Sequence, residues 1–420
     1  MIHDNNPDVI VIGAGLAGLA ATLQLQDLGY EVLLLEKSER IGGRLKTDWI
    51  NGYLFDHGFQ VLLTAYPETQ SILDYEQLNL CKFKPGSYIF KKSQRHYLGD
   101  PLRDLSSLPG SLFSRITTLK DKIKILKLSR SLKKKSLDEI FKEKEISTYQ
   151  VLISYGFSEK VIENFFKPFM SGIFLEDELF TSRRVFDFVF KMFAEGYAAI
   201  PEYGMEMIPR QLASRIHPQR ILTHKNVVSI DSKKVVLESG EEFESEKILI
   251  ATEAAELPSR YLGENLNIKF ESTTCFYFSA NKSPLSRPAL ALNASQNKLV
   301  NNFCVISDIS SRYAPTGKSL ISVSINDFID QPKEEETVEK IRLELRRFLG
   351  DEVEQWKFLK SYPVRYALPV QEKVELSHEQ SHFKINDNLF ICGDHMLNGS
   401  INSAISSGKI AARAIYESMI

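Results

Sequence analysis

The sequence predicts an α/β fold in which a Rossmann-type nucleotide-binding domain is interrupted by two insertions that form a smaller α+β domain. Three observations predict this class. The apolar run Val9–Ile12 is followed by a glycine-rich turn and then by apolar residues at helical spacing. A second apolar run, Val32–Leu35, ends in the acidic residue Glu36. Near the other end of the chain, residues 388–394 again form an apolar run that precedes a helical pattern.

The first strand–turn–helix unit has the residues that a pyrophosphate site needs. Gly13 allows the tight turn, Gly15 lets the backbone approach a phosphate, and Gly18 allows close packing of the helix on the strand. The N-terminus of the helix offers free N–H groups and the positive end of a dipole. We therefore expect the phosphates of a dinucleotide at this turn.

Glu36 is the expected ligand of the ribose. It lies eighteen residues after Gly18, close to the roughly 20-residue offset of a carboxylate that binds the ribose hydroxyls. A carboxylate at this position disfavours a 2′-phosphate.

A second glycine cluster adds to the specificity of the pattern. Gly42 and Gly43 permit a close approach of the backbone, and Arg44 directly after them can offer a guanidinium to the pyrophosphate. This extended pattern is more specific than a single glycine motif.

Composition and length fit an enzyme-sized chain with sizeable cores. The chain has 420 residues, of which 43% are hydrophobic. There is no run of 18 apolar residues, and the first seven residues lack the basic and apolar regions of a signal peptide. We therefore expect a cytoplasmic protein. A net charge of −2 argues against general binding of nucleic acid.

The four cysteines are Cys81, Cys275, Cys304 and Cys392. They are far apart and form no CxxC pair, so neither a disulfide framework nor a metal site is expected. Buried thiols are the simpler interpretation.

The predicted domains alternate along the chain. The nucleotide-binding domain is expected to comprise residues 1–87, 206–256 and 387–420. The two insertions, 88–205 and 257–386, are expected to form the second domain. The first insertion is rich in helical patterns and in basic residues.

Motifs at both ends and in the middle of the chain resemble one family. The N-terminal glycine motif with Glu36, the IGGR cluster at 41–44, the FDHG segment at 55–58, the ILIAT segment at 248–252 and the segment 392–412 are together similar to the FAD-containing amine oxidase superfamily. That superfamily also holds protoporphyrinogen oxidases and phytoene-type carotenoid desaturases.

The middle of the chain looks more like the desaturase and protoporphyrinogen oxidase branches than like the monoamine oxidases. This likeness is carried by residues 163–174 and by Pro201–Met205. The second segment departs from the family pattern, because Tyr203 stands where such enzymes often carry a glycine.

The resemblance implies a non-covalent FAD and an FAD-binding domain beside a substrate domain. It places Asp394 and Gly393 near the ribityl or phosphate region, Val227 or Val228 at the adenine, and Gly58 at the flavin ring. The expected cofactor-binding residues are Gly13, Gly15, Gly18, Glu36, Gly42, Gly43, Arg44, Gly58, Val227, Val228, Gly393 and Asp394.

Few acid or base side chains are expected at the flavin. His57 and Tyr366 are the candidate catalytic residues, since the family places their segments near the ring. A lone histidine is more often structural. Many amine oxidases have a lysine on the strand that corresponds to 271–278, where this chain has threonines, although Lys269 is near.

The resemblance therefore predicts transfer of hydride from a small hydrophobic substrate to flavin N5. A carotenoid, terpenoid or porphyrinogen-like substrate is favoured, and the acceptor that reoxidises the flavin is oxygen or a quinone. Oxidation of an amine is the enzymatic alternative, and a flavin-binding scaffold without turnover is the alternative of another class. The many phenylalanines of 165–193 fit either a core or an apolar pocket.

The segment 115–135 is basic and amphipathic. It has nine Lys or Arg residues against one acid, with Ile116, Leu119, Ile123 and Leu126 on one helical stripe. It predicts either peripheral contact with an anionic membrane or a solvated helix on the substrate domain.

Overall fold

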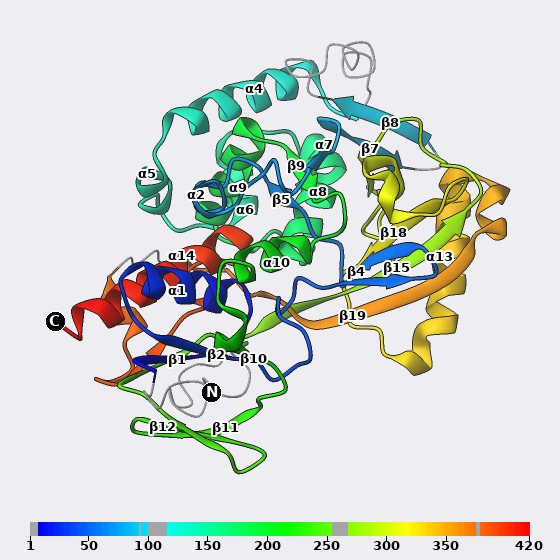
Figure 1. Cartoon of the computed structure of the whole chain (residues 1–420). Coiled ribbons are helices and arrows are strands. Elements are labelled where there is room, and N and C mark those ends of the chain that lie inside the picture. The colour runs from blue at the N-terminus through cyan, green and yellow to red at the C-terminus, as the bar shows by residue number, and fades with distance from the viewer. Residues whose placement is uncertain (1–6, 92–93, 100–115, 254–267, 375–378) are drawn as a thin grey trace.

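A computed structural model describes residues 7–91, 94–99, 116–253, 268–374 and 379–420. Two sheets dominate it, a parallel one that carries the nucleotide motif and a larger mixed one (Figure 1). This architecture confirms the predicted α/β class.

The parallel sheet is assembled from strands that are far apart in sequence. Its order is β10 (Ile221–Leu222), β2 (Val32–Leu35), β1 (Val9–Ile12), β14 (Lys247–Ile250) and β20 (Leu389–Ile391). All four pairings are parallel. Strands β1, β2 and β20 are short apolar runs that are buried throughout, as expected for a covered parallel sheet, whereas the edge strand β10 is only partly buried.

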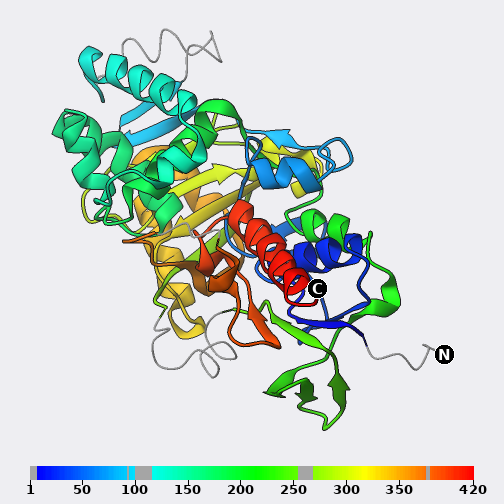
Figure 2. The ribbon, with the colours of Figure 1, turned by 90° about the vertical axis from the view of Figure 1, so that its left-hand side faces the viewer.

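Two helices cover one face of this sheet side by side. They are α1 (Leu16–Asp27) and α14 (Ile401–Glu417), seen in Figure 2 in blue and red. They approach so closely that a Cβ on Gly408 would overlap the Ala17 carbonyl oxygen. The C-terminal helix thus supports the helix that begins at the glycine-rich turn.

Residues 221–231 contain two strands that join two different sheets. β10 joins the parallel sheet, whereas β11 (Val227–Asp231) pairs antiparallel with β12 (Lys234–Leu237), which pairs with β13 (Glu242–Glu244). The break coincides with His224, whose φ of 56° lies in the left-handed region and turns the chain.

The larger sheet has seven strands. Its order is β19 (Lys357–Pro369), β15 (Phe270–Ala280), β18 (Ser319–Ile325), β17 (Asn302–Val305), β16 (Leu290–Asn293), β7 (Gly86–Lys91) and β8 (Gln94–Gly99). One face packs against the amphipathic helix α13 (Glu334–Leu349) through Val338, Ile341 and Leu345.

Helices of the first insertion lie over the other face of the seven-stranded sheet. They are α4 (Leu119–Lys134), α5 (Leu137–Phe141), α6 (Thr148–Ser154), α7 (Glu159–Val161), a π-helical turn (Ile162–Phe166), α8 (Lys167–Phe174) and α9 (Arg183–Glu195). Shorter elements complete the described chain: β3 (Thr47–Ile50), β4 (Tyr53–Asp56), β5 (Leu62–Leu63), α2 (Pro67–Ile72), β6 (Cys81–Lys82), β9 (Ala198–Ile200), α10 (Met207–Ala213) and α12 (Ile306–Ile309).

The predicted domain boundaries stay a prediction. Strands of the parallel sheet come from the three segments expected for the nucleotide-binding domain. The small sheet β5-β9-β6, however, joins strands from both predicted domains. Among the described residues, no helix combines the length and the apolar character that crossing a membrane requires.

Candidate active site

One cavity of about 1190 Å³ runs from the glycine-rich turn of the parallel sheet to the face of the seven-stranded sheet. This is larger than the roughly 300–1,000 Å³ of ordinary small-molecule sites. Its lining includes every one of the expected cofactor-binding residues except Gly18, together with both candidate catalytic residues.

The glycines of the two clusters face each other across the expected phosphate site. A Cβ on Gly43 would lie 3.2 Å from the Gly15 Cα, and Gly42 N–H donates to the Ala14 carbonyl (2.8 Å). Gly15 is the N-cap of α1 and no side chain caps the helix, so its first N–H groups face this space. Gly18 has a packing role, because a Cβ there would overlap the Gly13 carbonyl oxygen.

Glu36 is already oriented by the protein. Its Oε2 accepts the Ala14 N–H (2.8 Å), and its Oε1 accepts the Ser38 N–H (2.9 Å) and hydroxyl (2.7 Å). The residue is buried at the end of β2 and lines the cavity. Oε2 accepts only one of these bonds and keeps a lone pair for a ribose hydroxyl.

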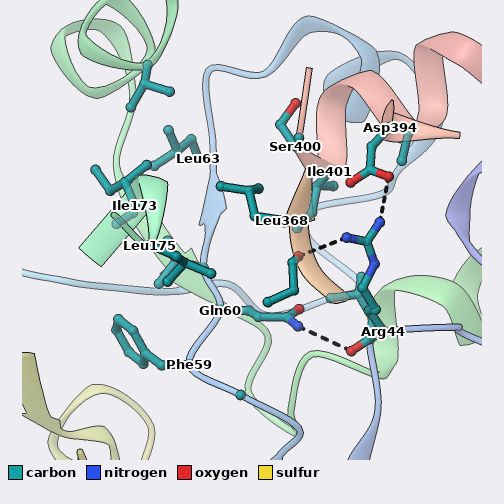
Figure 3. A pocket seen from close by; sticks show the side chains of 18 of the residues that line it. Arg44, Phe59, Gln60, Leu63, Ile173, Leu175, Leu368, Asp394, Ser400 and Ile401 are labelled. Atoms are coloured by element: carbon teal, nitrogen blue, oxygen red, sulfur yellow. Dashed lines mark hydrogen bonds and ion pairs between the residues drawn. The ribbon is translucent and has the colours of Figure 1, made fainter. Parts of the chain in front are cut away.

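Arg44 and Asp394 were predicted separately and form an ion pair. Arg44 Nη2 lies 2.6 Å from Asp394 Oδ1, and its Nη1 donates to the Ala367 carbonyl (2.9 Å), as Figure 3 shows. Burial disfavours the charged guanidinium, but the adjacent carboxylate outweighs this effect and raises the pKa of Arg44. The guanidinium is thereby fixed beside the phosphate cradle with N–H groups to spare.

The adenine end is expected at Val227 and Val228, which line the cavity at the start of β11. The register of β11 against β12 shifts between Val227 and Ser229. This irregularity turns the backbone of Val228 locally out of the regular ladder.

His57 lies on the cavity wall next to Gly58, over the ring of Tyr362 at a centroid distance of 4.4 Å. Its Nε2 is 3.1 Å from Asp48 Oδ2. Burial lowers the pKa of His57 more than the Asp48 carboxylate raises it, which favours the neutral imidazole.

Asp48 is held as a carboxylate. Burial alone would raise its pKa, but the Tyr362 hydroxyl (2.7 Å), His57 and Arg40 (2.9 Å) together lower it to about 2. An anchored carboxylate therefore orients the histidine.

Tyr366 lines the cavity with its ring against Phe270, at a centroid distance of 5.5 Å. Thr273 on β15 also lines the cavity, whereas Lys269 does not. The wall formed by β15 thus presents a threonine to the cavity.

The segment Pro201–Met205 does not line the cavity. Met205 N–H donates to Asp56 Oδ1 (2.9 Å), which anchors the segment to β4. Tyr203 points outward, with the Arg312 guanidinium over its ring. The substitution of a glycine by Tyr203 therefore leaves the cavity unchanged.

The far half of the cavity is apolar, and the phenylalanines of 165–193 divide between core and cavity. Phe166, Phe186 and Phe188 are fully buried in the core. Those that line the cavity are Phe165, Phe169, Phe190 and Phe193. Some of these phenylalanines therefore belong to the core and others line an apolar pocket, which were the two interpretations that the sequence left open.

Helix α4 forms part of the cavity rim. Leu119, Ile123 and Leu126 line the cavity, and the first two are still 65% and 48% exposed. A capping box between Thr118 and Asp121 starts the helix. Arg115, the first residue of the predicted basic segment, lies outside the described residues.

Among the buried polar atoms that have no hydrogen-bond partner within the described ranges, two lie on the wall beside the glycine cradle. They are Thr252 Oγ1, two residues after β14, and His395 Nε2, directly after Asp394. Unpaired buried polar atoms beside a glycine cradle fit a bound polar ligand, because leaving them unpaired costs free energy. The residues present thus fit a dinucleotide-type cofactor.

Sequence reasoning missed Asp48, Tyr362 and the apolar rim of α8. His395 could have been found, since it follows Asp394 in the C-terminal motif. The Asp48–Tyr362 contact joins residues 314 positions apart, and no local pattern signals such a pair.

The comparisons agree with this geometry. The family model described as flavin-containing amine oxidoreductase matches residues 16–416. Protoporphyrinogen oxidase 2, chloroplastic/mitochondrial, of Arabidopsis thaliana is 29% identical over 166 residues, which are 39% of this chain and 32% of that protein. The 4,4'-diapolycopene oxygenase of Methylomonas sp is 44% identical over 104 residues, 21% of this chain and 20% of that protein.

The matched regions span about a third or less of the length of these curated relatives. Among solved structures, a triple mutant of putrescine oxidase with redesigned cofactor binding has a TM-score of 0.72 and 16% identity, covering 98% of this chain and 99% of that one. At this identity the likeness shows the fold alone.

Proposed function

Because the chain belongs to the flavin-containing amine oxidoreductase family, it is a flavin-dependent oxidoreductase, and we propose that it binds FAD non-covalently and oxidises a hydrophobic substrate. The proposed substrate is a carotenoid, a terpenoid or a porphyrinogen-like molecule. One observation carries the proposal: a single cavity joins the phosphate cradle to a wall of phenylalanine and leucine side chains.

The nucleotide half of the cavity supports FAD. Gly15 and Gly43 leave room for the pyrophosphate, Arg44 supplies a positive charge, and Glu36 accepts the ribose hydroxyls. None of the four cysteines, all of which lie within the described residues, lines the cavity. A thioether link to the cofactor therefore has no candidate cysteine.

Bound FAD would supply a hydride acceptor, and the chain would supply orientation, electrostatics and exclusion of water. Phe169, Phe193 and Leu175 exclude water from the apolar half. Neutral His57, oriented by Asp48, offers a hydrogen bond at the junction of the two halves. Tyr366, which is on β19, adds an aromatic surface to the cavity wall.

Purified protein tests the cofactor. It should be yellow, and acid precipitation should release FAD into the supernatant. Flavin that stays on the pellet would contradict the non-covalent proposal, and colourless protein that fails to take up FAD would contradict the cofactor.

Anaerobic addition of substrate tests the reaction. A porphyrinogen or a desaturase-type polyene should bleach the flavin absorbance, and putrescine should not. Recovery of the absorbance in air, or only with a quinone, assigns the electron acceptor. Bleaching by the amine alone would show that the substrate is an amine. If no substrate class bleaches the flavin, a flavin-binding scaffold without turnover is favoured.

A further inference from the structure

The wall of the apolar half contains a polar strip on neighbouring strands. Asn302 on β17 and Ser324 on β18 are directly opposite each other in the antiparallel ladder, so their side chains share one sheet face. Both line the cavity. Asn302 is 3% and Ser324 is 5% exposed. The strip therefore lies inside the cavity and away from bulk solvent.

The hydrogen-bonding capacity of this strip is not used by the protein. Within the described part of the chain, Ser324 Oγ and Asn301 Nδ2 are buried without a partner. By contrast, Thr273 on the adjacent strand donates its hydroxyl to the Ile325 carbonyl (2.8 Å). Buried polar groups in native proteins are nearly always paired, so these atoms require an explanation.

A glycine lets helix α8 approach this strip closely without covering it with a side chain. Gly172 of α8 lines the cavity, and a Cβ there would lie 2.6 Å from Asn302 Nδ2 and 2.9 Å from Asn301 Nδ2. The π-helical turn Ile162–Phe166 immediately precedes α8, and such turns are frequent at functional sites.

Asn301, the residue before Asn302, does not line the cavity but lies directly behind the strip. Its Oδ1 accepts from the Lys298 ammonium (2.6 Å) and from the Ser171 hydroxyl (3.0 Å), so the unpaired part of its amide is the N–H side. On the wall itself, the Ser324 hydroxyl and the Asn302 amide can each donate a hydrogen bond to a ligand oxygen.

We propose that Asn302 and Ser324 form a subsite that binds an oxygen-bearing group, a carbonyl or a hydroxyl, on an otherwise apolar substrate. The inference rests on the proposed hydrophobic substrate and narrows its class to oxygen-bearing molecules. An entirely hydrocarbon substrate would leave the donors unpaired in the complex and is disfavoured.

The test uses two probes of matched shape, acetophenone and ethylbenzene, which share a benzene ring and a two-carbon chain. Their dissociation constants for the purified holoprotein are measured by isothermal titration, and the ratio of the two constants is compared between variants. This comparison cancels the different solvation of the free probes. Ser324→Ala and Asn302→Ala should each shift the ratio against acetophenone by about fivefold to tenfold, the contribution of one neutral hydrogen bond.

Gly172→Ala provides an independent variant, because its methyl group would press on the Asn302 and Asn301 amides and displace them without changing any polar residue. It should shift the ratio in the same direction. Ser322→Ala is the matched control: Ser322 is on β18 with its Oγ against Cys275 Sγ and does not line the cavity. It should leave the ratio unchanged.

Thermal unfolding separates a binding role from a structural one. Ser324→Ala removes an unpaired hydroxyl, so its melting temperature without probe should equal or exceed that of the wild type. A ratio that is the same in all variants, or a wild type that binds neither probe, would overturn the subsite. Flavin content and its bleaching are recorded on the same preparations, so that failure of the proposed oxidation is recognised separately.

Discussion

At the residue scale, the Arg44–Asp394 pair links the second glycine cluster to the C-terminal motif. The Asp394 side chain is only 9% exposed, and the guanidinium is the cation beside it. Arg44→Met would leave this carboxylate without its partner. We expect a loss of about 3–5 kcal/mol in the free energy of unfolding, the usual cost of breaking a buried pair.

The double variant Arg44→Met/Asp394→Asn should regain part of this stability, because no charge is left uncompensated. Chemical denaturation of the flavin-free protein measures it. A double variant as unstable as the sum of the two single variants would show that the pair does not couple these segments.

Asp187 on α9 predicts a pH dependence of stability. The residue is buried, with Arg183 Nε 3.1 Å from its Oδ2, and burial raises its pKa to about 6 despite that ion pair. A pKa above that of the unfolded chain means that the folded state binds this proton more tightly. The stabilisation is therefore complete below about pH 4 and is lost as pH rises towards 6.

Relative to Asp187→Asn, the wild type should lose up to about 3 kcal/mol between pH 4 and pH 7. Denaturant unfolding of both proteins at several pH values measures the difference. If the wild type instead gains stability over this range, the ion pair with Arg183 outweighs the burial of the carboxylate.

Residue patterns predicted residues that line one cavity better than they predicted the contacts of those residues. Gly15, Gly43 and Glu36 were singled out because backbone conformation and fixed spacing along the chain mark them, and the structure brings all three to the cavity wall. Asn302 and Ser324 were missed, because asparagine and serine in a strand look ordinary until the ladder brings them to one cavity wall.

At the element scale, helix α4 joins the cavity rim to a basic surface. Figure 1 shows it on the outer side of the helical layer, at the opposite end of the molecule from β1 and β2. The residues that line the cavity on this helix include exposed Leu119 and Ile123, and Lys120, Lys127 and other lysines lie beside them. We propose that an anionic lipid surface contacts α4, and that the substrate enters the cavity from it.

Wild-type protein should co-sediment with anionic vesicles but not with neutral ones, and should dissociate as salt rises. Each lysine near the surface contributes roughly 1 kcal/mol, screened within a Debye length. The quadruple variant of Lys120, Lys124, Lys127 and Lys134 to Gln should lose this binding and keep its flavin. If the wild-type protein does not bind anionic vesicles, α4 is instead a solvated helix on the predicted substrate domain.

Strands were predicted correctly where the sequence pattern fits only one kind of sheet. The runs that became β1, β2 and β20 are apolar throughout, which requires a sheet covered on both faces. The run over 221–230 is β-rich along its length, and nothing in it says which of two sheets each half joins. The left-handed His224 decides this, and a positive φ at a histidine leaves no mark in hydrophobic periodicity.

At the scale of the whole molecule, the expected FAD site is made by segments from the entire chain. The cradle belongs to α1, the ribose carboxylate to β2, and the adenine wall to β11. Arg44 reaches Ala367, 323 residues away, and pairs with Asp394. Ligand binding therefore connects the two ends of the chain, and it should stabilise the molecule as a unit.

The two halves of the nucleotide should contribute separately to this stabilisation. We expect the adenosine on the β2–β11 side, where Glu36 and Val227 line the cavity, and the flavin ring near Gly58. In thermal unfolding of the flavin-free protein, FAD at 100 times its dissociation constant should add about 2.7 kcal/mol. ADP should give a smaller shift of the melting temperature at the same concentration, and FMN should give little, because it cannot reach Glu36 from the flavin end.

Glu36→Ala should reduce the shifts produced by FAD and ADP and leave any shift by FMN unchanged. Equal shifts by FMN and FAD would mean that the adenosine half makes no use of Glu36, and the nucleotide would then have to be placed elsewhere in the cavity.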